Sequence, residues 1–121
     1  MIVGHVRDTL PRVTLVLPGS AGPLPVELIV DTGFEGDLTL PLSILQRTDA
    51  EPLYLSLRSL ADGTLRECPV YQLLMAWNEE ARTVQVVGLE HNPLLGVLLL
   101  EGCHLDLEFI EGAEVIIEFP D

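Results

Sequence analysis

Short apolar alternation, interrupted every few residues by turn-forming residues, constrains the fold of this chain more than any other feature. In residues 12–17, and again in 25–30, apolar side chains occupy every second position, which is the period of a strand with one buried face. Gly, Pro, Asp and Asn separate these segments, as they do where strands turn. The pattern predicts an all-β chain with strands at 12–17, 25–30, 37–40, 53–60, 65–77, 83–89, 104–109 and 113–119.

Two segments depart from simple alternation. Residues 42–47 follow Pro41 and could form one helical turn, since Pro is favoured at a helix start. The apolar run at 94–100 suits a buried strand or a short buried helix, and we favour a strand that enters a short helix near Val97. Many short strands with little helix predict a small closed or nearly closed β-barrel, and we expect a closed one with one short helix. The length predicts that residues 1–121 form a single domain.

The chain is strongly acidic, with 19 Asp and Glu residues against 6 Lys and Arg and a formal net charge of −13. Such a surface repels phosphate backbones and anionic membranes, so we expect no nucleic acid or membrane partner. No apolar stretch reaches the roughly 18 residues of a transmembrane helix, and residues 1–8 lack a signal-peptide core. Cys68 and Cys103 do not make a disulfide framework, so we expect free thiols and a cytoplasmic location.

The segment Ile29-Val30-Asp31-Thr32-Gly33 carries the clearest chemical signal. An apolar strand here delivers a carboxylate to a turn, and Gly33 lets the backbone reverse. A strand-end carboxylate beside a tight turn can be held rigidly, as a catalytic base requires. The alternative is an ordinary turn in which Thr32 and Gly33 are turn formers, so the context must decide.

The order of the later segments favours the catalytic interpretation. A long hairpin has Ala61-Asp62-Gly63 at its tip, because Asp-Gly tolerates the positive φ angles of a tight turn. Leu94-Leu95-Gly96 then follows inside a buried run. This order, together with the segment Asp31-Thr32-Gly33-Phe34-Glu35-Gly36-Asp37-Leu38-Thr39-Leu40-Pro41, resembles the retropepsin-like aspartic peptidases, especially their small bacterial and archaeal members. The resemblance covers the chain from about Gly4 to Phe119.

The resemblance implies a fold and a role for individual positions. The implied fold is the closed retropepsin barrel with a flap hairpin. Asp31 matches the catalytic carboxylate, Thr32 the residue that braces two catalytic loops across a dimer, and Gly33 the support of the catalytic turn. Substrate contacts are implied for Phe34, for the flap tip Ala61-Asp62-Gly63, and for Leu95. Phe34 departs from the small residue of the viral enzymes, which affects the pockets more than the chemistry.

Hydrolysis of a peptide by carboxylates needs two of them around one water, one to take its proton and one to donate a proton. The chain has a single Asp-Thr-Gly segment and is too short for two lobes. The second carboxylate must then come from another copy, with Asp31 facing its symmetry mate. The predicted function is an aspartic endopeptidase that cleaves extended peptides as a homodimer, with no cofactor. The alternative is a peptide-binding or dimerisation module with little turnover.

Several other residues admit two interpretations. By the same resemblance Val115, Ile117 and Phe119 belong to the dimer interface, but a place in the core is equally consistent with their alternation. Glu35 and Asp37 lie close to Asp31 in the sequence; Glu35 could point at the cleft and disfavour ionisation of the carboxylate pair, or could be a solvated loop carboxylate. The histidines and cysteines form no paired motif, so no metal site is predicted.

Overall fold

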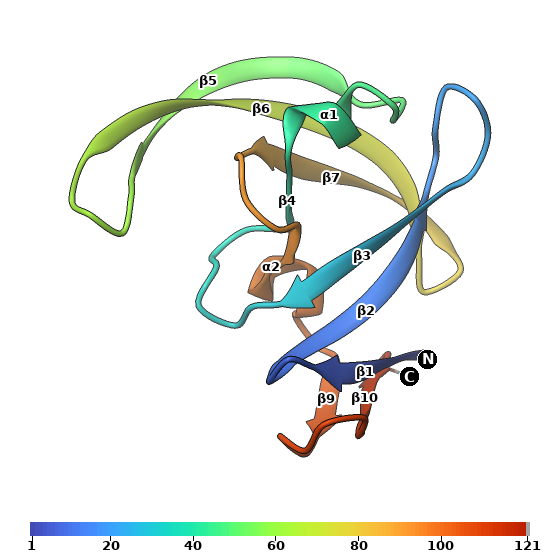
Figure 1. The fold of residues 1–121 in the computed structure, drawn as a ribbon. Coiled ribbons are helices and arrows are strands. Elements are labelled where there is room, and N and C mark those ends of the chain that lie inside the picture. The colour runs from blue at the N-terminus through green and yellow to red at the C-terminus, as the bar shows by residue number, and fades with distance from the viewer. Residues whose placement is uncertain (121) are drawn as a thin grey trace.

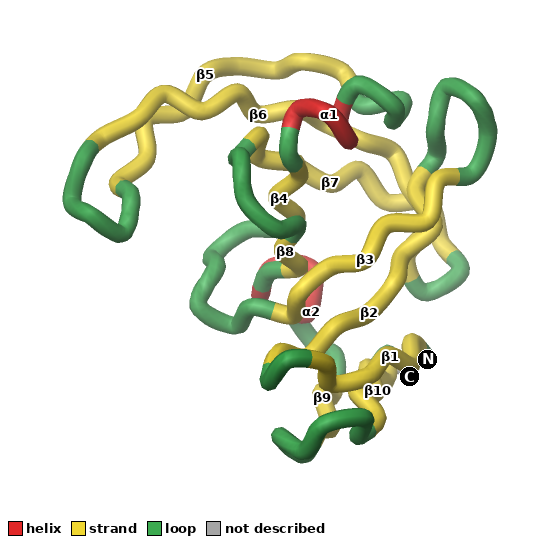
Figure 2. The backbone as a smooth tube through the Cα atoms, viewed as in Figure 1, coloured by secondary structure: helices red, strands yellow, loops and turns green. Residues whose placement is uncertain are grey.

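The computed structural model describes residues 1–120, in which nearly all regular structure is strand, joined in a single ten-stranded sheet (Figures 1 and 2). In chain order the strands are β1 (Ile2–Arg7), β2 (Leu10–Leu17), β3 (Leu24–Val30), β4 (Leu38–Leu40), β5 (Glu51–Ser59), β6 (Leu65–Trp77), β7 (Glu80–Gly88), β8 (Leu94–Leu95), β9 (His104–Leu107) and β10 (Glu114–Glu118). Two helices of four residues each accompany them, α1 (Leu42–Leu45) and α2 (Val97–Leu100).

The sheet is mixed, and its parallel pairings lie at its centre. The strand order is β5-β6-β7-β4-β8-β3-β2-β1-β10-β9. β3 runs parallel to β8, β4 runs parallel to β7, and the remaining neighbours are antiparallel. These pairings bring the end of β3, the short β4 and the start of α2 together, although they are far apart in the sequence.

The core follows the alternation expected from the sequence. On β2 and β3, every second side chain is buried: Val13, Leu15 and Leu17, then Leu24, Val26, Leu28 and Val30. β6 and β7 cover this layer with the buried side chains Leu73, Met75, Trp77, Val84 and Val86. Each fully buried aliphatic side chain contributes about 1.5–3 kcal/mol, so this cluster accounts for much of the favourable free energy of folding.

The prediction of a closed β-barrel of retropepsin type is wrong. A barrel requires the first and last strands of the sheet to pair, whereas here β5 pairs only with β6, and β9 only with β10. β5 and β6 instead project as a curved arm (Figure 1). The alternating residues Leu53, Leu55 and Leu57 of β5 are 42%, 65% and 64% exposed. Alternation correctly marks a strand here, but it does not specify which strand becomes its neighbour.

Two further differences separate the structure from the sequence-based expectation. Residues 1–120 hold two short helices where the predicted fold had one, because residues 42–45 and 97–100 both form a turn of helix. β1 was not predicted at all. The run at 94–100 does split into a strand and a short helix, as expected. No helix in residues 1–120 has the length and apolar character needed to cross a bilayer.

The C-terminal strand β10 packs inside its own chain. Val115 and Ile117 are fully buried, and β10 pairs with both β1 and β9. The ring of Phe119 meets the ring of Trp77 edge to face, with centroids 5.0 Å apart. Of the two interpretations of these residues, the core one fits Val115 and Ile117, which have no surface to offer a second copy.

Candidate active site

Asp31 stands where β3 leaves the sheet, and its backbone is fixed on both sides. Ile29 and Val30 pair in parallel with Leu94 and Leu95 of β8. The Asp31 N–H then donates to the Leu95 carbonyl oxygen at 2.9 Å, which extends the pairing by one residue. The position of Asp31 is therefore set by the central strands of the sheet, as a catalytic group requires.

The Asp31 carboxylate is oriented by its own turn. The Gly33 N–H donates to Asp31 Oδ1 at 2.9 Å, and the Phe34 N–H donates to the Asp31 carbonyl oxygen at 3.2 Å. A Cβ atom at Gly33 would stand 3.2 Å from Oδ1, so a larger residue would crowd the carboxylate. Asp31 is half-buried, whereas Thr32 and Gly33 are exposed. The turn thus presents one constrained carboxylate at the surface of the chain.

The loop after Gly33 is fastened to the start of α2 by three backbone hydrogen bonds. Gly96 N–H donates to the Asp37 carbonyl oxygen at 2.8 Å, Val97 N–H to that of Phe34 at 3.0 Å, and Leu98 N–H to that of Gly36 at 3.1 Å. The chain can approach this closely only because residue 96 has no side chain. A Cβ there would lie 2.6 Å from Phe34 Cδ2 and 2.8 Å from its carbonyl oxygen.

Two polar side chains of the β4 region brace the same loop. Asp37 Oδ2 accepts a hydrogen bond from the Gln85 N–H at 3.0 Å, and Arg82 Nη2 lies 3.9 Å from Asp37 Oδ1. Thr39 is fully buried, and its hydroxyl accepts a hydrogen bond from the Leu94 N–H at 3.1 Å. The contacts of Asp37 are therefore structural, and no pattern in the sequence indicates the role of Thr39.

The other two side chains of interest in this loop, those of Glu35 and Phe34, lie in different surroundings. Glu35 is exposed, which matches the interpretation of a solvated loop residue. Phe34 is half-buried and packs against a small cluster of Cys68, Val70 and Val87, separate from the main core. The first aromatic residue after the Asp-Thr-Gly turn thus contacts the base of the β5–β6 hairpin.

The hairpin tip has the turn expected from Asp-Gly. Leu60 and Thr64 close it, with the Leu60 N–H donating to the Thr64 carbonyl oxygen at 2.8 Å, and Gly63 has a φ of +84°. Asp62 Oδ1 accepts hydrogen bonds from the Thr64 hydroxyl at 2.7 Å and from its N–H at 3.0 Å. These hydrogen bonds lower the pKa of Asp62, and they identify it as a turn former. Ala61, Asp62 and Gly63 are all exposed.

Leu95 is the predicted substrate-binding residue whose location fits that role least. Its side chain has no exposed surface, so in the single chain it supports the Asp31 turn from beneath. The structure therefore brings Asp31, Thr32, Gly33, Phe34 and Leu95 together. The tip at Ala61-Asp62-Gly63 belongs to an arm that projects on the same side as the loop between β3 and β4 (Figure 1).

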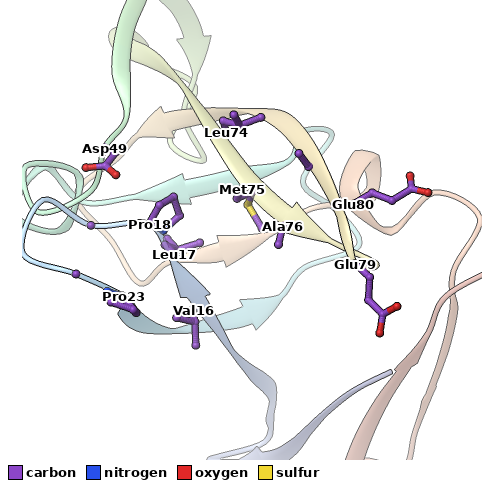
Figure 3. Close-up of a pocket in the computed structure, with 13 residues that line it drawn as sticks. Val16, Leu17, Pro18, Pro23, Asp49, Leu74, Met75, Ala76, Glu79 and Glu80 are labelled. Carbon is purple, nitrogen blue, oxygen red and sulfur yellow. The ribbon is translucent and has the colours of Figure 1, made fainter.

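The chain also has a hollow away from these residues. A shallow apolar groove of about 640 Å³ has Val16, Pro18, Pro23, Leu74, Met75 and Ala76 among its lining residues, with acidic side chains at its edge (Figure 3). It begins just before β3, roughly 25 Å along that strand from Asp31. None of the predicted site residues lines it. Within residues 1–120, no three His, Cys, Asp or Glu side chains are placed to hold a metal ion, and both cysteines are free.

Neither a family model, nor a curated protein, nor a solved structure matches this chain. A functional assignment therefore has to come from the geometry of the Asp31 turn and from the chemistry that one oriented carboxylate can perform.

Proposed function

We propose that the chain is an aspartic endopeptidase that works as a homodimer, with Asp31 from each copy acting on one water. The observation that carries the proposal is the constrained Asp31 carboxylate, which accepts a hydrogen bond from Gly33 while its backbone is pinned to β8. A carboxylate oriented in this way suits a general base, since proton transfer depends first on geometry.

The second copy follows from the chemistry. One carboxylate cannot both take a proton from water and give one to the scissile amide, and a twofold axis beside the turn would supply the second. Thr32 and Gly33 are exposed next to Asp31, and Leu98 on α2 is 49% exposed although it is apolar. These three residues offer a surface on which two turns can meet, with Thr32 bracing the partner turn.

In the pair, two neighbouring carboxylates share one proton, because two like charges a few Å apart are costly. The ionised Asp31 takes a proton from the water, which attacks the peptide carbonyl carbon. The protonated Asp31 of the other copy donates to the carbonyl oxygen. Collapse of the tetrahedral intermediate breaks the C–N bond. The Asp31 that took the water proton gives it to the leaving amine, and the other Asp31 takes its proton back from the hydroxyl formed at the former carbonyl oxygen.

The test is cleavage of an unfolded protein by the purified protein between about pH 4 and 7, where a proton-sharing pair can act. Asp31→Asn should abolish cleavage. The matched control is Asp106→Asn, because Asp106 is an exposed carboxylate on β9, and it should leave the rate unchanged. Cleavage that persists in Asp31→Asn would refute the mechanism.

Sedimentation velocity tests the dimer separately. We expect the wild-type protein to sediment as a dimer at tens of micromolar, and Thr32→Val to dissociate more readily without a change in chain stability, since Thr32 is exposed. A monomer at all concentrations would leave Asp31 without a partner and remove the basis for hydrolysis.

A further inference from the structure

The β5–β6 hairpin carries an unusual pair of like charges. Arg58 on β5 lies directly opposite Arg66 on β6. Like charges in opposed positions of an antiparallel pair are unfavourable. The pair is not a consequence of a basic composition, because the chain has only 6 Lys and Arg residues against 19 Asp and Glu. Two of these six basic residues therefore face each other on one hairpin of an acidic protein.

No ion pair within residues 1–120 neutralises Arg58 or Arg66. The ion pairs within residues 1–120 involve three other arginines: Arg7 and Arg12 with Glu27, and Arg82 with Asp37. The Nε atom of Arg58 is buried and has no hydrogen-bond partner. Buried donors are nearly always satisfied in native proteins, so the hydrogen bonding of the Arg58 guanidinium is incomplete within residues 1–120.

The arginines point to the side of the hairpin that meets the candidate active site. Opposed residues share a face, and side chains alternate along each strand, so Arg58 and Arg66 share a face with Cys68 and Val70. Cys68 and Val70 form the cluster against which Phe34 packs. Phe34 directly follows the Asp-Thr-Gly turn. The charged pair therefore occupies the hairpin face that continues from the contact with the Asp31 loop.

We propose that Arg58 and Arg66 bind a carboxylate of the substrate, so that the protein selects extended peptides with a Glu or Asp side chain near the cut bond. This inference rests on the proposed peptidase function, whose substrate class it specifies. Guanidinium groups bind carboxylates through paired, charge-assisted hydrogen bonds, and one carboxylate between two arginines also relieves their mutual repulsion. The positive charge of the two arginines also offsets the repulsion that an acidic peptide would otherwise experience from the Asp31 pair.

The test uses two peptides that differ only by Glu or Gln next to the cut site, each with blocked termini. The kcat/KM value should favour the Glu peptide by roughly tenfold, equivalent to about 1.4 kcal/mol. Arg58→Gln and Arg66→Gln should each remove most of this preference. The matched control is Arg47→Gln, because Arg47 follows α1 and its backbone contacts the β2–β3 turn; this variant should keep the preference. No preference in the wild-type protein, or an undiminished one in both hairpin variants, would overturn the inference.

The substrate carboxylate could belong to an acidic side chain or to the C-terminus of the peptide. A third peptide, with Gln beside the cut site and a free C-terminus, distinguishes these two sources. A preference that follows only the free C-terminus would overturn selection of an acidic side chain. Sedimentation of the hairpin variants supplies a second check. Both variants should remain as dimeric as the wild type. Dissociation would indicate that the arginines bind an acidic group of the other copy rather than the substrate, and would overturn the inference.

Binding to the inactive variant distinguishes failure of this inference from failure of the proposed function. Fluorescence anisotropy with labelled peptides should show that Asp31→Asn binds the Glu peptide more tightly than the Gln peptide, and that adding Arg58→Gln removes the difference. If the wild type cuts neither peptide while this binding difference persists, the peptidase proposal fails and the carboxylate site stands. If both peptides are cut equally and bind equally, the peptidase proposal stands and the carboxylate site fails.

Discussion

Replacing Gly96 with Ala should damage the Asp31 turn from behind, without touching the carboxylate. The backbone of Gly96 has a φ of −101°, which any residue can adopt, so the cost is purely steric. An added Cβ would lie 2.6 Å from Phe34 Cδ2 and 2.8 Å from its carbonyl oxygen, and closer still to the Gly36 carbonyl oxygen. The loop would have to retreat by roughly 1 Å to restore ordinary contact distances.

The magnitude follows from what this retreat breaks. Overpacking of a close contact costs roughly 1–3 kcal/mol. The hydrogen bonds from Gly96 and Val97 to the loop carbonyl oxygens of Asp37 and Phe34 would stretch, and each contributes roughly 1 kcal/mol. We expect a loss of roughly 2–5 kcal/mol in the free energy of unfolding. Under the proposed peptidase function, displacement of Asp31 by about 1 Å should also lower the cleavage rate by roughly a hundredfold.

Urea denaturation followed by the fluorescence of Trp77 measures this loss, because Trp77 is the single tryptophan and is buried in the core. The control is Gly112→Ala. Gly112 has a φ of +82° and open space around it, so Ala there should cost only about 1 kcal/mol from backbone strain. If Gly96→Ala is no more destabilising than Gly112→Ala, the close packing of α2 against the loop does not hold the turn.

Three further changes test other parts of the structure. Hydrogen bonding to Arg7, at 2.9 Å between Nη1 and Oε2, holds the pKa of Glu27 below its ordinary value. Glu27→Gln should therefore cost about 0.5 kcal/mol at neutral pH, and the difference should vanish as the pH falls through the lowered pKa of Glu27, measured by urea unfolding. Burial raises the pKa of the Cys103 thiol, and Cys68 is fully buried. Iodoacetamide at pH 8 should therefore modify Cys103 slowly and Cys68 only after unfolding, and mass spectrometry measures both modifications. Thr39→Val should cost roughly 1 kcal/mol by leaving the partly buried Leu94 N–H of β8 unpaired, and thermal unfolding measures this loss.

Local patterns predicted the strands that bury one face, while the arrangement of those strands depended on information that local patterns lack. The alternation of 12–17 and 25–30 identified β2 and β3 because their apolar faces are buried in the core. It misjudged β5, whose apolar residues alternate equally well but remain exposed. A barrel was therefore inferred from strand content, although closure depends on which edges meet.

β1 escaped prediction for a physical reason. Gly4 lies in its middle, and glycine weakens the strand pattern because it offers no side chain to pack. The structure explains this glycine, since a Cβ there would overlap the carbonyl oxygen of Arg12 on the neighbouring strand. The feature that obscured the strand in the sequence is the one that lets two strands approach.

The candidate site was predictable where the chemistry is local. Asp31 was identified because a strand, an acid and a glycine turn are contiguous in the sequence. The bracing by Thr39 and the opposed arginines at 58 and 66 depend on strand register, which no short segment encodes. Leu95 was assigned to substrate contact by resemblance, but its side chain is completely buried. Whether a side chain of this apolar run is exposed depends on three-dimensional packing, which the short segment does not encode.

The parallel pairing of β3 with β8 also dictates when the Asp31 turn can acquire its shape. The Asp31 N–H is bonded to a carbonyl of Leu95, a residue synthesised long after it. A chain emerging from the ribosome cannot order this turn until β8 has left the exit tunnel, and such distant pairings close slowly because of their loop entropy. The Asp31 turn therefore remains unordered until β8 has emerged and paired with β3. Pulsed hydrogen exchange during refolding should show the Asp31 amide among the last to gain protection.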